Sequence, residues 1–388
     1  MKIAIPKERR AGEARVAATP ETVKKLMALG AEVAVEAGAG LGAAITDEAF
    51  RAAGASIVHD AGALLSSADV ILKVQRPMSA AEGAPGGGVD ELAQAKPGAL
   101  LIGVLAAFSN KDQVADYARR NLTAFSMELM PRITRAQAMD VLSSQSNLAG
   151  YKAVVDAASE FGRVFPMMMT AAGTVPPARV LVLGAGVAGL QAIATARRLG
   201  AIVSAFDVRP VAKEQVESLG ATFIMVESAE AASAETKAGY AKEMSEDYKR
   251  KQADKIHETL KKQDIAICTA LIPGKPAPIL ITEAMVRDMK PGSVIVDLAV
   301  EAGGNCEGAE YGKIVVTHGV KIMGYANVPA RVAVDASALY ARNLLQLVTL
   351  LIDKESKQLK INWDDEIIKA TVLTHDGAVV NPALTGNP

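Results

Sequence analysis

The ten residues from Val180 to Gly189 read Val-Leu-Val-Leu-Gly-Ala-Gly-Val-Ala-Gly. Four apolar residues predict a buried strand, and three glycines follow directly with the spacing Gly-x-Gly-x-x-Gly. In this pattern the first glycine permits a tight turn, the second lets the backbone approach a pyrophosphate, and the third lets a helix pack closely on the strand. The stretch therefore predicts a dinucleotide-binding turn of the Rossmann type, formed by Gly184, Ala185, Gly186, Val187 and Gly189.

The residues after this turn complete the predicted nucleotide site. A helix expected over residues 187–199 presents free backbone N–H groups to the phosphates. The next expected strand, 202–206, leads into Asp207, which stands where the fingerprint places an acidic side chain. A carboxylate there accepts both hydroxyls of the adenosine ribose and repels a 2′-phosphate, so NAD is favoured over NADP. Arg209 complicates this preference, because an arginine nearby can hold a 2′-phosphate.

Length and composition exclude several other classes of protein. The 388 residues suffice for about two domains. Because 42 basic and 43 acidic side chains nearly cancel and only 4% of residues are aromatic, we expect no nucleic-acid partner. Two isolated cysteines, Cys268 and Cys306, provide neither a disulfide framework nor metal-ligand spacing, which fits a reducing compartment. The most apolar C-terminal stretch, 344–352, is far shorter than the roughly 20 residues of a membrane helix, so no membrane insertion is expected.

Alternating strand and helix patterns predict an α/β fold of two Rossmann-like domains, each a mostly parallel sheet flanked by helices, with a cleft between them. The first domain is expected over residues 1–145, joined by a C-terminal helical segment that returns over 331–388. The second is expected over 146–330. The predicted strands are 2–5, 32–36, 69–74, 100–104 and 123–127, then 180–183, 202–206, 222–225, 265–269, 293–298 and 313–317.

Residues 164–175 do not fit the alternating pattern. They predict two short apolar strands, rich in methionine, around a glycine turn, without a core of their own. An apolar hairpin of this kind needs another surface to cover it. A contact with a second subunit and a hairpin folded back on its own domain are equally compatible with the sequence.

Residues 227–251 interrupt a connection that usually takes about 2–6 residues. The segment is rich in Ala, Glu, Ser and Lys, and its large apolar residues, Tyr240, Met244 and Tyr248, are too few to hold it tightly down. We expect a mobile loop near the nucleotide over 227–248. A solvated surface helix is the alternative, and it is favoured for the lysine-rich residues 249–262.

No residue is an obvious general acid or base. A dehydrogenase acting on a hydroxy or amino acid moves a proton with the hydride and usually employs His or Lys. Of the four histidines, only His318 follows a predicted strand of the second block, and such a residue is more often structural. The polar segment 131–147 instead groups Arg132, Gln137, Asp140 and Ser143, whose donors and acceptors suit a carboxamide such as that of nicotinamide. An interdomain hinge held by an Arg–Asp pair explains the same residues.

The sequences IPKE at residues 5–8 and EARVAATP at 13–20 resemble the N-terminus shared by alanine dehydrogenases and the alpha subunit of proton-translocating NAD(P) transhydrogenase. The resemblance covers essentially the whole chain. Alanine dehydrogenases carry a catalytic histidine where this chain has Ala106, and an aspartate before a Gly-Gly pair where it has Glu301. Lys73 and the pyruvate-binding arginine, here Arg15, are kept in both branches. Residues 132–147 are similar to the nicotinamide-site loop of transhydrogenase, which favours that branch.

This resemblance implies a subunit that binds NAD(H) and passes hydride directly to or from NADP(H) on a partner domain, with proton movement through a separate membrane domain. It implies a homodimer, an NADP(H)-binding beta subunit and a membrane-domain subunit, and activity only with those partners. The implied location is cytoplasmic, peripheral on the cytoplasmic face of the bacterial inner membrane. Hydride transfer between two nicotinamides needs alignment and dryness rather than an acid or base, which agrees with the missing histidine.

Family roles carried onto matching positions define the expected site. The nicotinamide end comprises Arg132, Ile133, Thr134, Arg135, Gln137, Asp140 and Ser143; the adenosine and pyrophosphate end comprises residues 184–189 with Asp207, Val208 and Arg209; Gly239, Tyr240 and Met244 belong to the closing loop, and Ala270 and Leu271 follow a strand. The hairpin 164–175 resembles the segment exchanged between the subunits of the family's dimer. An amino-acid dehydrogenase acting through Lys73 and Arg15, and an NAD sensor without turnover, are the alternatives.

Overall fold

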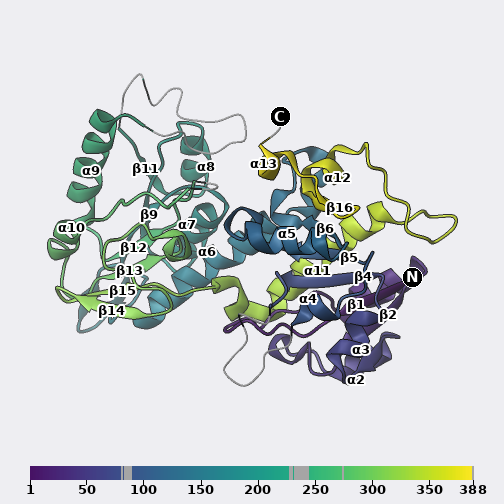
Figure 1. Ribbon diagram of the computed structural model, residues 1–388. Helices are drawn as coiled ribbons and strands as arrows, with labels where there is room; N and C mark the ends of the chain where they lie inside the picture. The colour runs from purple at the N-terminus through teal and green to yellow at the C-terminus, as the bar shows by residue number, and fades with distance from the viewer. Residues whose placement is uncertain (80–81, 83–89, 227–229, 231–243, 273–274, 387–388) are drawn as a thin grey trace. The chain divides into compact units, whose positions relative to one another are not determined.

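The computed structural model describes residues 1–79, 82, 90–226, 230, 244–272 and 275–386, and the chain divides into two compact units (Figure 1). Unit 1 contains Met1–Gln145 and Ala330–Pro388, and unit 2 contains Ser146–Pro329. The first division falls inside helix α6, Val141–Glu160, and the second falls inside the 3-10 turn η8, Val328–Val332. The chain therefore builds most of unit 1, then unit 2, and returns to unit 1 before it ends.

The described residues of unit 1 form an eight-stranded sheet in the order β17-β16-β6-β5-β4-β1-β2-β3. Its strands are β1 (Lys2–Ile5), β2 (Glu32–Glu36), β3 (Ser56–Val58), β4 (Val70–Gln75), β5 (Leu100–Val104), β6 (Thr123–Ser126), β16 (Val372–His375) and β17 (Ala378–Val379). Strands β1 to β6 are parallel, whereas β16 runs antiparallel to β6 and β17 antiparallel to β16. The yellow C-terminal segment thus extends the sheet beyond β6 (Figure 1).

Helices cover both faces of this sheet because its strands are apolar on both sides. In β1, Ile3 and Ile5 face one core, with α11 and α1, while Ala4 faces the other, with α3 and α5. Helix α1 begins after Thr19, whose hydroxyl caps the N–H of Thr22. The helices of unit 1 are α1 (Pro20–Ala28), α2 (Asp47–Ala52), α3 (Ala61–Ser66), α4 (Glu91–Gln94), α5 (Lys111–Arg119), α11 (Ala333–Leu351), α12 (Glu366–Thr371) and α13 (Pro382–Thr385).

The described residues of unit 2 form a seven-stranded sheet in the order β11-β10-β9-β12-β13-β15-β14. Its strands are β9 (Arg179–Leu183), β10 (Ile202–Phe206), β11 (Thr222–Ile224), β12 (Ile265–Cys268), β13 (Val294–Asp297), β14 (Ile314–Thr317) and β15 (Val320–Met323). All pairs are parallel except β14 with β15. The order in which strands are added to the sheet reverses between β9 and β12, since β10 and β11 lie on one side of β9 and β12 and β13 lie on the other. This reversal is the switch point where open α/β sheets bind ligands.

Helices α6 and α7 (Val187–Arg198) pack on one face of this sheet with α8 (Ala212–Ser218), and α9 (Glu246–Leu260) and α10 (Glu283–Arg287) pack on the other. The predicted fold class is confirmed, since each unit has a mostly parallel sheet flanked by helices. Strands β15, β16 and β17 were not predicted. No helix in the described ranges is long and apolar enough to cross a membrane.

The apolar hairpin predicted over 164–175 exists as β7 (Met168–Thr170) and β8 (Gly173–Val175), an antiparallel pair separate from both large sheets. Its base is fixed to unit 2, because Phe165 and Ala178 are both buried and joined by a backbone hydrogen bond of 2.9 Å. Every side chain of the two strands is exposed. The alternative in which the hairpin folds back to bury itself on its own unit is therefore wrong.

Candidate functional site

The predicted glycine turn lies between β9 and α7, at the carboxyl edge of the sheet of unit 2. Gly184 has a φ of +97°, which glycine adopts without strain. A Cβ on Gly189 would lie 1.8 Å from the carbonyl oxygen of Gly184, so this close approach of helix to strand requires glycine. Nothing lies within 4 Å of the corresponding position on Gly186, which is the N-cap of α7. The space beside Gly186 therefore leaves the N–H groups of the first helical turn open to a phosphate.

Asp207 and the turn are joined directly. The Asp207 carboxylate is only 6% exposed and accepts the Ala185 backbone N–H at 2.8 Å. It also accepts the Arg209 backbone N–H at 2.9 Å and two guanidinium N–H groups at 2.9 and 2.7 Å. Val208 between them is half-buried against the sheet core. The turn, the acidic residue and Arg209 are thus brought together as predicted, and Arg209 already lies where it offsets the Asp207 charge.

The loop after β12 lies beside the glycine turn. The Thr269 hydroxyl donates to the Gly184 carbonyl oxygen at 2.9 Å, and Ala270 follows it. Leu271 is half exposed. Because β12 and β9 are neighbours across the switch point, Ala270 and Leu271 lie at the same sheet edge as the glycine turn.

The polar segment 131–147 belongs to unit 1 except for its last two residues. It forms a 3-10 turn, η5 (Thr134–Met139), followed by α6. Asp140 caps α6, accepting the Ser143 N–H at 2.9 Å and its hydroxyl at 2.5 Å. Buried Ala136 anchors the turn, so the polar side chains remain on its surface. The exposed ones are Arg132, Thr134, Arg135 and Gln137, while Ile133 is half-buried.

Arg135, in the same polar segment, forms an Arg–Asp pair of its own, because its guanidinium binds both oxygens of Asp365 at 2.6 and 2.9 Å. Both residues lie in unit 1. The pair therefore attaches η5 to the start of α12 and is not an interdomain contact. The pKa of Asp365 is lowered, chiefly by this hydrogen bond from Arg135.

Two predicted site residues, Gly239 and Tyr240, lie outside the described residues. Met244 is buried with Val226 and Tyr248 in the core beneath α9. Tyr248 is only 2% exposed, its hydroxyl has no hydrogen-bond partner among the described residues, and burial, with the nearby Asp207 charge, raises its pKa. The expectation that these apolar residues cannot hold the segment down is wrong from Met244 onward, because α9 inserts Tyr248, Ile256 and Leu260 into the core.

His318 does not lie near the glycine turn. It follows β14, but β14 is antiparallel to its neighbour, so its carboxyl end lies at the amino edge of the sheet. The imidazole there pairs with Glu283 at 3.0 Å on the surface. Cys268 is fully buried, and burial raises the pKa of its thiol well above the usual value. No group of three His, Cys, Asp or Glu in the described ranges could hold a metal ion.

Lys73 and Arg15, which an alanine dehydrogenase would employ, are engaged by carboxylates in unit 1. The Lys73 ammonium donates to both Glu91 oxygens at 2.7 and 2.9 Å and lies 3.5 Å from Glu8. Two Arg15 nitrogens donate to Glu13 at 2.8 and 2.7 Å, and a third donates to Gln145 at 2.8 Å. Both cations are buried. A substrate carboxylate would therefore have to displace existing ion pairs.

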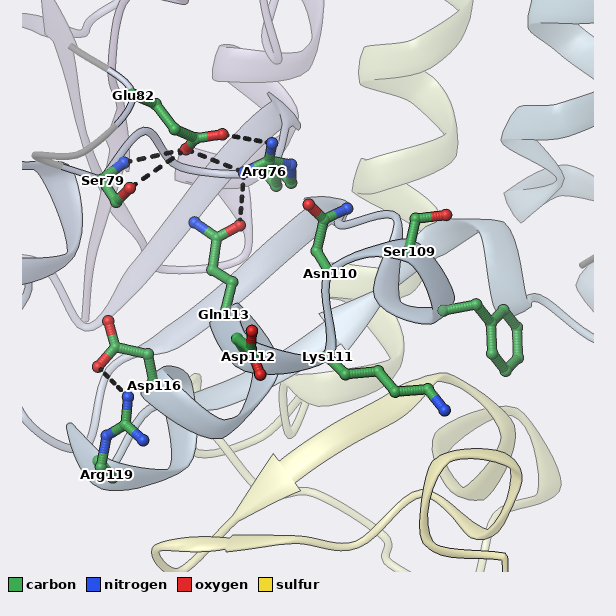
Figure 2. Close-up of a pocket in the computed structure, with 11 residues that line it drawn as sticks. Arg76, Ser79, Glu82, Ser109, Asn110, Lys111, Asp112, Gln113, Asp116 and Arg119 are labelled. Atoms are coloured by element: carbon green, nitrogen blue, oxygen red, sulfur yellow. Dashed lines mark hydrogen bonds and ion pairs between the residues drawn. The ribbon is translucent and has the colours of Figure 1, made fainter. Parts of the chain in front are cut away.

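A hollow of about 580 Å³ lies beside this region, at the carboxyl ends of β4 and β5 (Figure 2). Several of its charged side chains are paired: Arg76 faces Glu82 and also binds Gln113 at 2.8 Å, and Asp116 binds Arg119. Burial raises the pKa of Glu82, but hydrogen bonds from Arg76 and Arg10 dominate and lower it to about 2. No histidine is among the described residues that line the hollow.

Comparison with known proteins accounts for both units. Residues 4–149 match the model described as alanine dehydrogenase/PNT, N-terminal domain, and residues 153–382 match the corresponding C-terminal domain. The chain belongs to the alanine dehydrogenase/PNT family. The resemblance inferred from residues 5–8 and 13–20 is thereby confirmed.

Relatives within this family fall in both of its branches. The first of the polypeptides that make up the alpha subunit of NAD(P) transhydrogenase in Rhodospirillum rubrum is 64% identical over 100% of this chain and 99% of its own. The crystal structure of a transhydrogenase from Sinorhizobium meliloti is 53% identical, covers 98% of this chain and 100% of its own, and superposes with a TM-score of 0.87. Alanine dehydrogenase of Halomonas elongata is 31% identical over 99% of this chain and 96% of its own.

Sequence reasoning did not identify several residues that support the site. Thr269, Asp297 and Asn305 fix the loops at the carboxyl ends of β12 and β13, and Gly150 on α6 admits the Ala188 backbone beside the glycine turn. One signal was available. Asp297 lies near the end of a predicted strand, and Asn305 follows a Gly-Gly pair in the turn after it, where side-chain amides commonly bind backbone groups.

Proposed function

We propose that this chain is the NAD(H)-binding subunit of a proton-translocating transhydrogenase, and that hydride passes directly between NAD(H) on this chain and NADP(H) on a partner domain. The observation that carries the proposal is the state of Lys73 and Arg15. Both are buried in ion pairs with this chain's own glutamates. A reaction on an oxo acid needs these cations for substrate, whereas transfer between nicotinamides does not.

The residues at the carboxyl edge of unit 2 fit a dinucleotide. The open space beside Gly186 and the N-terminus of α7 suit a pyrophosphate, and Asp207 suits the hydroxyls of the adenosine ribose. Arg209 lies on the same carboxylate, so it would have to yield part of its contact when the ribose binds. We assign NAD(H) to this chain because Asp207, rather than Arg209, directly follows the last residue of β10.

The nicotinamide end of the site is assigned to Arg132, Gln137, Asp140 and Ser143, with Ile133, Thr134 and Arg135 beside them. Their amide, hydroxyl and guanidinium groups orient a carboxamide. Hydride transfer between nicotinamides does not require these groups to donate or accept a proton. A nicotinamide cofactor supplies the hydride when bound. Gly239, Tyr240, Met244, Ala270 and Leu271 complete the assigned site.

The names of the relatives support the remaining assignments. The Rhodospirillum rubrum relative is named as one portion of a transhydrogenase alpha subunit, a name that implies further subunits. We propose a homodimer formed through the β7–β8 hairpin, an NADP(H)-binding beta subunit and a membrane-domain subunit. The proposed place is the cytoplasmic face of a bacterial inner membrane, held there by those partners.

A mixing assay tests the proposal. This chain, with the NADP(H)-binding partner from the same organism, is expected to reduce an NAD analogue with NADPH, and neither component alone is expected to do so. The same chain with NADH, pyruvate and ammonia is expected to show no oxidation. Oxidation by pyruvate and ammonia without a partner would instead establish an amino-acid dehydrogenase. NAD binding without turnover in the complete mixture would establish an NAD sensor.

A further inference from the structure

Asn305 is fully buried and every polar group of this residue is bonded. Its side-chain oxygen accepts the Ala270 N–H at 3.0 Å, and its side-chain nitrogen donates to the Ala270 carbonyl at 2.9 Å and the Pro278 carbonyl at 2.8 Å. Its own carbonyl accepts from Leu280 at 2.8 Å and Ile281 at 3.0 Å. One amide group thus binds both ends of the loop that follows β12.

Asp297 fixes Asn305 in turn. This carboxylate ends β13, is fully buried, and accepts the backbone N–H groups of Asn305 at 2.7 Å, Cys306 at 2.9 Å and Ala299 at 2.9 Å. A Cβ on Gly304 would lie 2.9 Å from the same carboxylate, so the turn passes as close to it as a glycine allows. The position of the Asn305 amide is therefore fixed by the carboxylate at the end of β13.

The loop held by Asn305 is also tied to the glycine turn. Thr269, directly before Ala270, donates its hydroxyl to the Gly184 carbonyl at 2.9 Å and lies within hydrogen-bond reach of the Leu183 carbonyl at 3.2 Å. Hydrogen bonds thus join Asp297 to Asn305, Asn305 to Ala270, and Thr269, the residue before Ala270, to the turn. Any displacement of Ala270 shifts a wall of the nucleotide site at its switch point.

We infer that Asn305 is a positioning residue for hydride transfer: it sets the place of the loop at Ala270 and Leu271, and so the orientation of the bound nicotinamide. This inference rests on the proposed function. Asn305 does not contact the reacting atoms in this assignment. It acts through the backbone of Ala270, whose N–H and carbonyl it holds simultaneously. A buried amide with every donor and acceptor paired is costly to replace and defines one backbone geometry.

Asn305→Asp tests the inference with a change of almost no volume. The carboxylate keeps the acceptor for the Ala270 N–H but loses both donors and faces two carbonyl oxygens. We expect the hydride-transfer rate with the partner to fall on the order of 100-fold, the cost of a misplacement of about 1 Å. The dissociation constant for NADH is expected to rise by less than about tenfold, within about 1.4 kcal/mol of the native chain.

The pH profile gives a second readout. A buried carboxyl beside carbonyl oxygens has a raised pKa, and its protonated form regains one O–H donor. Transfer by the Asn305→Asp chain is therefore expected to recover partly as pH falls, relative to the native chain. Asp297, whose pKa is also raised by burial, accepts the backbone N–H of this same position in both chains, so its titration is common to both profiles. A loss that is equal at all pH values would contradict the inference.

Asn381→Asp is the matched control. Asn381 is buried in unit 1, donates to the carbonyls of Ala370 at 3.1 Å and Val372 at 2.8 Å, and accepts the Ala383 N–H at 3.1 Å. This amide binds a loop in the same manner, but in unit 1 and outside the proposed site. The control is expected to lose similar thermal stability and to keep the native transfer rate. If both variants lose transfer equally, Asn305 is merely structural and the inference fails.

Two measurements keep the test decisive. If Asn305→Asp does not fold, Thr269→Val removes the hydroxyl that joins the same loop to Gly184, and it is expected to lower transfer more than NADH affinity. The emission of bound NADH is recorded for the chain without its partner. A native chain that binds NADH but transfers nothing with the partner refutes the proposed function. An unchanged emission in the Asn305→Asp chain then refutes the positioning role separately.

Discussion

Glu8 lies in the same buried cluster as Lys73, but its charge is less well compensated. One of its carboxylate oxygens accepts the Val74 N–H at 2.6 Å, and the other has no hydrogen-bond partner among the described residues. Burial raises the pKa of Glu8, and the charges of Glu91 and Glu13 add to this. Lys73 and the Val74 N–H oppose the rise without cancelling it. The folded chain therefore binds the Glu8 proton more tightly than the unfolded chain does.

Glu8→Gln is expected to stabilise the chain increasingly as pH rises. With a folded pKa above the unfolded one, the native chain loses stability as pH climbs from the unfolded value through the folded one. Glutamine keeps an acceptor for the Val74 N–H and cannot ionise. Urea unfolding at about pH 5 and about pH 8 should show a larger gain at the higher pH. A gain confined to the lower pH would refute this account.

Glu21→Gln is a control whose effect on stability is expected to have the opposite sign. Hydrogen bonds from Arg342 and Lys25 lower the pKa of this exposed carboxyl to about 2. Its contribution is present above the unfolded pKa and is lost only in strong acid. The substitution should therefore cost a little stability at neutral pH, and this cost should shrink as pH falls toward the folded value.

In the turn between β9 and α7, glycine is expected at two positions for two different reasons. Gly189 needs its missing side chain for the protein's own packing, because a Cβ would lie 1.8 Å from the Gly184 carbonyl oxygen. Gly186 meets no protein atom within 4 Å, so any requirement for glycine there comes from the nucleotide. Gly189→Ala is expected to cost about 1–3 kcal/mol of stability or more, as overpacking does. Gly186→Ala is expected to leave the melting temperature unchanged and to weaken NADH binding at least about tenfold.

Calorimetry and NADH titration on both variants check this separation. Gly162→Ala is the neutral control, since it has open space around it and no positive φ, and its stability should stay within about 0.5 kcal/mol of native. If Gly186→Ala destabilised the chain as much as Gly189→Ala, steric demand of the protein would explain both glycines. Unchanged NADH affinity in Gly186→Ala would place the pyrophosphate elsewhere.

The elements differ in how far their sequence reveals them. Most strands of both sheets and the turn at Gly184 were predictable because apolar period and glycine spacing are local properties. Strand direction is not local: the same pattern that predicts β14 says nothing of its antiparallel pairing, which places His318 at the edge of the sheet opposite the glycine turn. The role of Asn305 depends on Ala270 and Pro278, residues brought to it only by the fold. Likewise Lys73 could be recognised, but Glu91, which binds it, could not.

Across the molecule, the two units carry different residues at the point where the strand order of each sheet reverses. Each sheet reverses strand order once, between β1 and β4 in unit 1 and between β9 and β12 in unit 2. In unit 2 the strand ends at this point carry glycine, a threonine that binds the turn and open helix N–H groups. In unit 1 Glu8 follows β1 and Lys73 lies in β4, and Lys73 binds Glu91 and faces Glu8. Open backbone donors suit a dinucleotide in unit 2, while the carboxylates around Lys73 compete with any acidic substrate in unit 1.

The β7–β8 hairpin bears on the assembly of the whole molecule. A two-stranded hairpin with all its side chains in water is marginally stable at best, yet Met169, 78% exposed, and its neighbours Met167 and Met168 are apolar. The buried base at Phe165 and Ala178 projects them from unit 2. A second copy of the chain that covers the hairpin removes this cost for both copies, because a two-fold contact repeats every interaction.

Met169→Glu is therefore expected to dissociate the dimer. Sedimentation equilibrium of the native chain should give about twice 40.4 kDa, and the variant should give 40.4 kDa at the same concentration. Two carboxylates brought into a shared apolar contact should raise the dissociation constant on the order of 100-fold or more, since charge placed there costs several kcal/mol. Val316→Glu is the control, because Val316 is exposed on the edge strand β14. A native monomer would refute the proposed dimer, and dissociation by Val316→Glu alone would assign the contact to β14 instead of the hairpin.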